Sequence, residues 1–175
     1  MDELSLHYLN TVRKVFTNYR NMAEKAMAQL SDEQFFFLLD PESNSTALIV
    51  KHLAGNMRSR WENYLSEDGE KPDRHRDQEF IMDGDTRASL MAAWEKGWTL
   101  AFQALDDVPD LHYKVKIRGE DHTILEAIER QIAHVSYHVG QMVFLAKHLK
   151  SEDWQTLSIP RNQSQQFNQQ MQDKK

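Results

Sequence analysis

The stretch TILEAIERQIAHVSYHVGQMVFLAKHL, residues 123–149, is the most apolar helical pattern in the chain and decides its fold class. Thr123 and Glu126 form a capping-box pattern at its start, in which each side chain satisfies a backbone N–H group that the first turn of a helix leaves free. Apolar residues then recur at helical spacing to about Leu149. The pattern predicts one long helix that packs against the rest of the chain.

Three further helical patterns precede this stretch. We expect amphipathic helices over about residues 4–30, 46–65 and 86–104, with a short capped turn that begins at Ser31 and Gln34. Four long helical patterns and no credible sheet predict an all-α protein with the architecture of a four-helix bundle.

Two connecting segments stand out between these helices. Residues 66–85 are polar and contain two glycines and a proline, which predicts a long loop, and ordered loops of that length are often functional. Residues 113–118, YKVKIR, alternate between polar and apolar side chains, so we expect a small hairpin or an extended segment there at most.

The domain organisation follows from these elements. Residues 1–150 are expected to form a single bundle domain, and residues 151–175 a polar, glutamine-rich C-terminal tail. Trp154 and the SIP segment at 158–160 are expected to dock this tail in part, with fraying beyond Phe167.

The composition excludes several classes of protein. A chain of 175 residues with 40% hydrophobic residues can bury a substantial core, and no apolar run is long enough to cross a membrane. The acidic N-terminus does not resemble a secretory signal, so we expect a cytoplasmic protein. The net charge of −6 argues against non-specific binding to nucleic acid. The lack of cysteine means that nitrogen and oxygen atoms must hold any metal ion.

The most informative functional feature is the pair His134 and His138. Four residues apart on a helix, the two imidazoles lie one turn apart on the same face and can bind one metal ion together with a third ligand. Gln131 and Gln141 continue the same polar stripe on an otherwise apolar helix. The spacing alone also fits two exposed histidines, or two buried histidines that are hydrogen-bonded to other protein groups. Such pairs arise by chance in a chain with eight histidines.

A second polar stripe on the helix expected at 46–65 supplies a third histidine. His52, Asn56 and Arg60 follow one another at steps of four on this mostly apolar helix. If the two stripes face each other, His52, His134 and His138 form a three-nitrogen site suited to zinc, nickel or ferrous iron. The alternative is a core histidine at position 52, bonded to a backbone carbonyl or a water.

Other residues near these histidines have two interpretations each. Asn56 and Gln141 lie beside histidines and could orient a ligand or contact a substrate. Arg60 could hold a carboxylate or phosphate group near the metal, although we prefer the simpler interpretation that it reaches solvent at the end of the bundle. The charged run DGEKPDRHRDQE, residues 68–79, is either a solvated loop or a lid over the site.

Several motifs resemble those of the DinB/YfiT-like group of bacterial four-helix proteins. The segments KHLAGNM around His52 and HVSYHVGQ around the histidine pair match the metal-histidine positions of that group. The resemblance is greatest to an uncharacterised branch and spans nearly the whole chain. The motifs that recur in that branch are KHLAGNM-x-SRW at 51–61, DGEKP at 68–72, IRGE at 117–120 and SIP at 158–160.

The resemblance implies an up-down-down-up bundle, a divalent metal held by His52, His134 and His138, and frequent homodimers. Some characterised relatives are S-transferases that use low-molecular-weight thiols such as bacillithiol, and others isomerise maleylpyruvate with a bound thiol cofactor. In one respect the chain departs from the group, because Val139 stands where an arginine usually follows the second histidine of the last helix. The contact that this arginine makes in relatives therefore does not carry over.

The function expected first is a metal-dependent thiol S-transferase acting on a small electrophile, with no nucleic-acid or membrane partner. One alternative is a non-catalytic metal-binding or stress-response module, including a structural metal site closed by protein ligands. A metal-dependent hydrolase is another, because a metal ion can activate water even where no protein nucleophile stands out.

Overall fold

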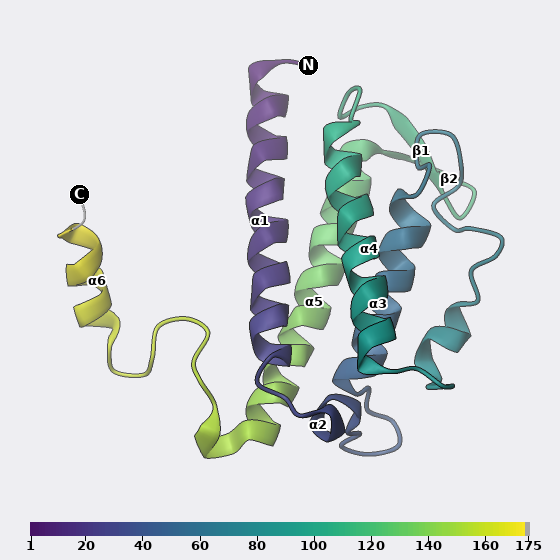
Figure 1. The fold of residues 1–175 in the computed structure, drawn as a ribbon. Helices are drawn as coiled ribbons and strands as arrows, with labels where there is room; N and C mark the ends of the chain where they lie inside the picture. Colours follow the sequence, from purple (N-terminus) through teal and green to yellow (C-terminus); the bar gives the residue numbers. More distant parts are fainter. Residues whose placement is uncertain (174–175) are drawn as a thin grey trace.

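The computed structural model describes residues 1–173 and is mostly helical, as predicted (Figure 1). Two short helices and two 3-10 turns accompany four long helices and a two-stranded sheet. The long helices are α1 (Glu3–Met27), α3 (Thr46–Trp61), α4 (Arg87–Asp106) and α5 (Ile124–Lys150). The remaining elements are α2 (Asp32–Phe36), η1 (Arg76–Phe80), β1 (Lys114–Ile117), β2 (Glu120–Thr123), η2 (Ser151–Asp153) and α6 (Ser164–Gln172).

Side-chain caps begin the helices where the sequence predicts them. Ser31, Thr86 and Thr123 each form a complete capping box, at the starts of α2, α4 and α5. The side chain of Ser45 accepts a hydrogen bond from the backbone N–H of Leu48 at the start of α3. These local hydrogen bonds satisfy N–H groups that would otherwise lack partners, which explains why the helix starts are readable from the sequence.

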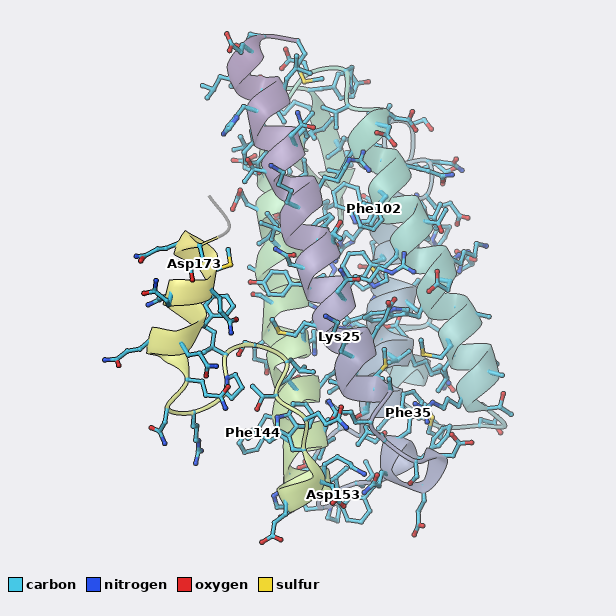
Figure 2. The ribbon with its side chains drawn as sticks, turned by 60° about the vertical axis from the view of Figure 1, so that its left-hand side comes forward. Lys25, Phe35, Phe102, Phe144, Asp153 and Asp173 are labelled. Atoms are coloured by element: carbon cyan, nitrogen blue, oxygen red, sulfur yellow. The ribbon has the colours of Figure 1, made fainter. Side chains whose placement is uncertain are left out.

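The four long helices lie side by side and enclose the core (Figure 1). α3 packs against α4 and α5, and α1 packs against the other side of both. Phe16 of α1 and Trp98 of α4 are fully buried, with ring centroids 5.8 Å apart, and Phe102 lies between α1 and α4 (Figure 2). At Gly97 of α4 a Cβ atom would lie 3.3 Å from the Cα of Ala54, so glycine allows a close approach of α3 and α4.

The hairpin of β1 and β2 covers one end of this helical core. Its strands pair antiparallel from Lys114 opposite Thr123 to Ile117 opposite Glu120. Arg118 and Gly119 form the two-residue turn, both with positive φ, as a type I′ turn requires. A two-stranded sheet is not stable alone, and this one is held because the side chain of Ile117 is buried in the helical core.

Three segments differ from the sequence expectation. α3 ends at Trp61 and not near Leu65, because the chain turns where Asn63 adopts a φ of 51°. The segment 66–85 is not wholly irregular, since it contains η1. Beyond Phe167, where we expect fraying, the chain is helical to Gln172.

The C-terminal segment packs on the core only in its first part. Trp154 and Leu157 pack against the core, whereas Ile159 of the SIP segment is exposed. Every residue of α6 is exposed, and the helix stands apart from α1 and α5 (Figures 1 and 2). Within residues 1–173, no helix has the length and apolar character needed to cross a membrane.

Candidate metal centre

The two polar stripes meet, and they bring His52 of α3 together with His134 and His138 of α5. Each histidine offers one nitrogen such that all three nitrogens lie within 4.8 Å of one another. The Nε2 atoms of His52 and His134 are 3.1 Å apart, and the ring centroids of the three pairs are separated by 4.6–5.1 Å. Residues 82 and 86 positions apart in the sequence therefore form one compact cluster.

The donor set fits a divalent metal ion. Two imidazole nitrogens bound to one zinc ion at about 2.0–2.1 Å would lie roughly 3–3.4 Å apart, and the 3.1 Å between the Nε2 atoms of His52 and His134 falls in that range. Neutral imidazoles without thiolates suit zinc, nickel or ferrous iron. His52 and His138 are buried and His134 is partly buried, so the cluster is shielded from bulk water.

Glu79 fixes the orientation of His52. Its Oε2 lies 2.8 Å from the Nδ1 of His52, and its carboxylate accepts two further bonds from the guanidinium of Arg74, at 2.8 and 3.0 Å. Burial raises the pKa of Glu79, but the bonds from His52 and Arg74 lower it more, so its pKa falls below the ordinary value. An ionised carboxylate only accepts hydrogen bonds, so the Nδ1 of His52 carries the proton and the Nε2 presents its lone pair to the cluster.

Gln141 holds the second ring of the pair in the same way. Its Oε1 lies 3.0 Å from the Nδ1 of His138, one turn further along α5. The amide oxygen accepts a hydrogen bond from the Nδ1–H group, which leaves the Nε2 of His138 as the free nitrogen. The structure thus places Gln141 beside a histidine of the cluster, and its role in orienting a ligand stays a prediction.

Burial keeps the paired histidines neutral. It lowers the pKa of His134 to about 3, with smaller contributions from the charges of His138 and His52. Burial also lowers the pKa of His138 to about 4. Both rings are therefore neutral at neutral pH, with one N–H and one free ring nitrogen each, which is the form that binds metal ions.

Gly55 makes room for the carboxylate that orients His52. A Cβ atom at this position of α3 would lie 2.4 Å from the Oε1 of Glu79, which is closer than any packing contact allows. Glycine in a helix interior costs about 1 kcal/mol relative to alanine. The glycine of the KHLAGNM segment thus lets η1 approach α3 closely enough for Glu79 to reach the histidine.

An open pocket of about 360 Å³ lies beside the cluster. His52 and His134 form part of its wall, together with Asn56 of α3. Arg60 also lines it, with a side chain that is only 12% exposed and that donates to the carbonyl oxygen of Gly69. Our preferred interpretation of Arg60 as a solvent-reaching residue is therefore wrong, whereas Asn56 and Arg60 remain candidates for substrate contact.

Sequence reasoning missed Glu79 and most of the arginines of the pocket. Glu79 lies 27 residues after His52, and no spacing rule links the two positions. The available signal was the charged run at 68–79, for which a lid was one of two interpretations. The structure places Arg74 and Glu79 of this run against the histidines, and Phe80 stacks on the ring of His52 at a centroid distance of 4.9 Å.

Val139 lies in the core and not in the pocket. Its side chain is 1% exposed and belongs to the same buried cluster as Val135 and Met142. The arginines that face the pocket in this chain come from other positions, including Arg130 nearer the start of the same helix.

Comparison with known families gives one match. The model of a family described as a protein of unknown function (DUF1572) matches residues 3–163. Comparisons with curated proteins and with solved structures gave no match.

Proposed function

The chain belongs to the DUF1572 family, and we propose that it is a metal-dependent enzyme that acts on a small molecule. His52, His134 and His138 hold the divalent ion, which is zinc, nickel or ferrous iron. The observation that carries this proposal is the convergence of three histidine nitrogens within 4.8 Å beside an open pocket. The ring of packed helices α1, α5, α3 and α4 supports the further proposal of a DinB/YfiT-like four-helix bundle.

The number of ligands favours catalysis over a structural role. Within residues 1–173, no aspartate, glutamate or fourth histidine joins the cluster of three. Structural zinc sites are closed by four protein ligands, whereas catalytic sites keep a position open for water or substrate. The adjoining pocket gives a small molecule access to that position.

The residues around the histidines prepare this site. A divalent ion bound there supplies a Lewis acid that polarises a substrate atom or lowers the pKa of a bound thiol or water. Glu79 and Gln141 fix the ring orientations of His52 and His138, so that the nitrogens do not have to be reorganised on binding. Phe80 covers one face of the His52 ring and excludes water from it.

A thiol transfer onto a small electrophile is the reaction that we propose first. Glu79 is the carboxylate bonded to the cluster, and it is already held by His52 and Arg74, so it is not a free general base. This arrangement favours a reaction in which the substrate brings its own nucleophile, as a thiol does. Hydrolysis is the second candidate, because water is also a nucleophile that the protein need not supply.

Metal analysis of the purified chain tests the proposed site. By inductively coupled plasma mass spectrometry we expect one divalent ion per chain. We expect that ion to be lost in His134→Ala and His138→Ala. His148→Ala is the matched control, because His148 lies on the same helix but is exposed and outside the cluster. Full metal content in His138→Ala after dialysis would contradict the assignment.

A panel of low-molecular-weight thiols with a chromogenic electrophile tests the reaction. We expect turnover that requires the ion and disappears in His134→Ala. Metal binding without turnover of any thiol, together with hydrolysis of an activated ester, would favour the hydrolase. Metal binding with neither reaction would favour the non-catalytic module.

A further inference from the structure

Five arginines face the pocket beside the histidine cluster, although the protein as a whole is acidic. They come from four separate parts of the fold, namely α3, the segment 66–86 that precedes α4 and includes η1, the turn between β1 and β2, and α5. These residues are Arg60, Arg74, Arg76, Arg118 and Arg130. In a chain of net charge −6, such a concentration of positive charge in one cavity needs a physical explanation.

Nearby carboxylates neutralise only part of this charge. Glu70 pairs with Arg60, Arg74 and Arg118, at 3.4, 3.4 and 3.0 Å. Glu79 pairs with Arg74. The carboxylate of Asp68 accepts hydrogen bonds from three backbone N–H groups. Five guanidinium groups thus face three carboxylates, which leaves an excess of two positive charges.

Two of the arginines have no carboxylate partner. Within residues 1–173, neither Arg76 nor Arg130 forms an ion pair, and Arg76 lies over the ring of Phe80 at 5.2 Å from its centroid. Burial lowers the pKa of Arg60, and although the charge of Glu70 raises it, the positive charges of Arg74, Arg118 and Arg130 lower it further. An anion in the pocket would relieve this mutual repulsion.

A buried polar group in the pocket wall also lacks a partner. The side chain of Gln131, one turn before His134 on α5, is part of the wall and is 3% exposed. Its Nε2 donates no hydrogen bond to any described residue. Buried donors are nearly always satisfied in native proteins, so a ligand with acceptor oxygens suits this position.

The backbone under one arginine is strained, which is typical of functional positions. Arg118 has a φ of 56°, a conformation that glycine or asparagine adopts more easily. Asp68 accepts the N–H groups of Arg118 and Gly119, at 2.8 and 2.7 Å, and so holds this turn against the segment 66–86. The guanidinium carried on this turn donates to Glu70 and lines the pocket.

From these observations we infer that the pocket binds a small molecule carrying at least two negative charges on oxygen, held by the arginines and Gln131. Phosphate monoesters and dicarboxylates share this chemistry, and guanidinium groups bind both in bidentate geometry. The inference rests on the proposed function in one respect, because it makes this anion the substrate or co-substrate of the metal site. The pocket volume of about 360 Å³ suits a small molecule and not a nucleic acid.

Calorimetric titration of the full-length, metal-free chain tests the inference. The three probes are inorganic phosphate, succinate and acetate, all at pH 7.5 and equal ionic strength. Comparing the two dianions with acetate measures the effect of charge, and comparing phosphate with succinate measures the effect of the type of oxyanion. We expect at least one of the two dianions to bind about tenfold more tightly than acetate. Preference for phosphate or for succinate identifies the type of anionic group.

Three variants make the test specific. Arg118→Gly keeps the turn geometry while it removes one charge, and Arg60→Gln removes a charge from the deeper wall; each should weaken dianion binding about threefold to tenfold. Arg58→Gln is the control, because Arg58 lies on the same helix but pairs with Glu62 and Asp73 outside this pocket. It should bind dianions as tightly as the unaltered protein.

Equal binding of acetate and both dianions, or loss of affinity in the control alone, would overturn the inference. Absence of any anion binding by the metal-free chain would do the same. Dianion binding by a chain that takes up no metal would refute the proposed function but leave the arginine pocket as an anion site. The two proposals therefore fail separately.

Discussion

The Nδ1 of His52 and the Oε2 of Glu79 lie 2.8 Å apart, and this bond connects the segment 66–86 to the histidine cluster. This bond places the proton of His52 on Nδ1. The unprotonated Nε2 therefore faces His134. The side chain of Glu79 is 10% exposed and that of Arg74 is 4% exposed, so the charges that orient His52 are shielded from water. A segment without regular structure over most of its length thus acts as the outer wall of the site.

Removing the charge of Glu79 should weaken metal binding. In Glu79→Gln we expect affinity for zinc to fall about tenfold to hundredfold, because a neutral amide orients His52 less strongly and can place its NH₂ group toward the ring. Competition with a chromogenic chelator measures this affinity. Asp77→Asn, an exposed position in the same 3-10 turn, should leave it unchanged.

Gly55→Ala should weaken metal binding without unfolding the chain. The added methyl group would lie 2.4 Å from the carboxylate of Glu79, which must move away from His52. We expect weaker zinc affinity in a chain that remains helical by circular dichroism. Gly140→Ala is the matched control, since nothing lies within 4 Å of its Cβ position, and it should raise stability by up to about 1 kcal/mol.

The metal-free protein should lose stability in acid. The folded-state pKa values of His134 and His138, about 3 and about 4, lie below the ordinary value of 6.5. The unfolded chain therefore binds more protons below pH 6.5, so the free energy of unfolding falls as the pH decreases from about 6.5 toward about 4.

Urea titrations at pH 7.5, 6 and 5 measure this slope, which is at most about 1.4 kcal/mol per pH unit for each histidine. His138→Gln should flatten it, whereas His148→Gln should not. A stability independent of pH across this range would show that the histidines are not buried as described.

Ser59→Ala should loosen the segment 66–86. The buried hydroxyl of Ser59 donates to the carbonyl of Gly69 at 2.7 Å and accepts from the backbone N–H of Lys71 at 3.2 Å. Loss of both bonds leaves the backbone N–H of Lys71 without its partner, although the Gly69 carbonyl keeps the bond from Arg60, and should cost about 1–3 kcal/mol. Hydrogen exchange should rise at residues 69–80, and Ser66→Ala, which removes only an exposed bond, should have little effect.

Several features of the structure could be predicted from the sequence, since they depend on a few neighbouring residues. The capping boxes at Ser31 and Thr123 involve side chains three positions apart. The proximity of His134 and His138 follows from the pitch of a helix, and the apolar periodicity of α5 is repeated within each turn. For the same reason the alternation over 113–118 predicted a hairpin or an extended segment, although it did not identify β2 as the partner strand.

Only the tertiary structure decided what surrounds the histidines. Glu79 reaches His52 across 27 residues, Arg118 reaches Glu70 across 48, and His134 reaches His52 across 82. Such pairs depend on where α3 ends, how the segment 66–86 folds back, and how closely Gly55 lets it approach. The sequence by itself determined the helices and the two polar stripes, because local hydrogen bonds and periodicity act over short distances. Packing between distant segments decided that the stripes meet beside a pocket lined with arginines. Charged and hydrogen-bonding groups that are far apart in the chain become neighbours only when the helices pack into one core.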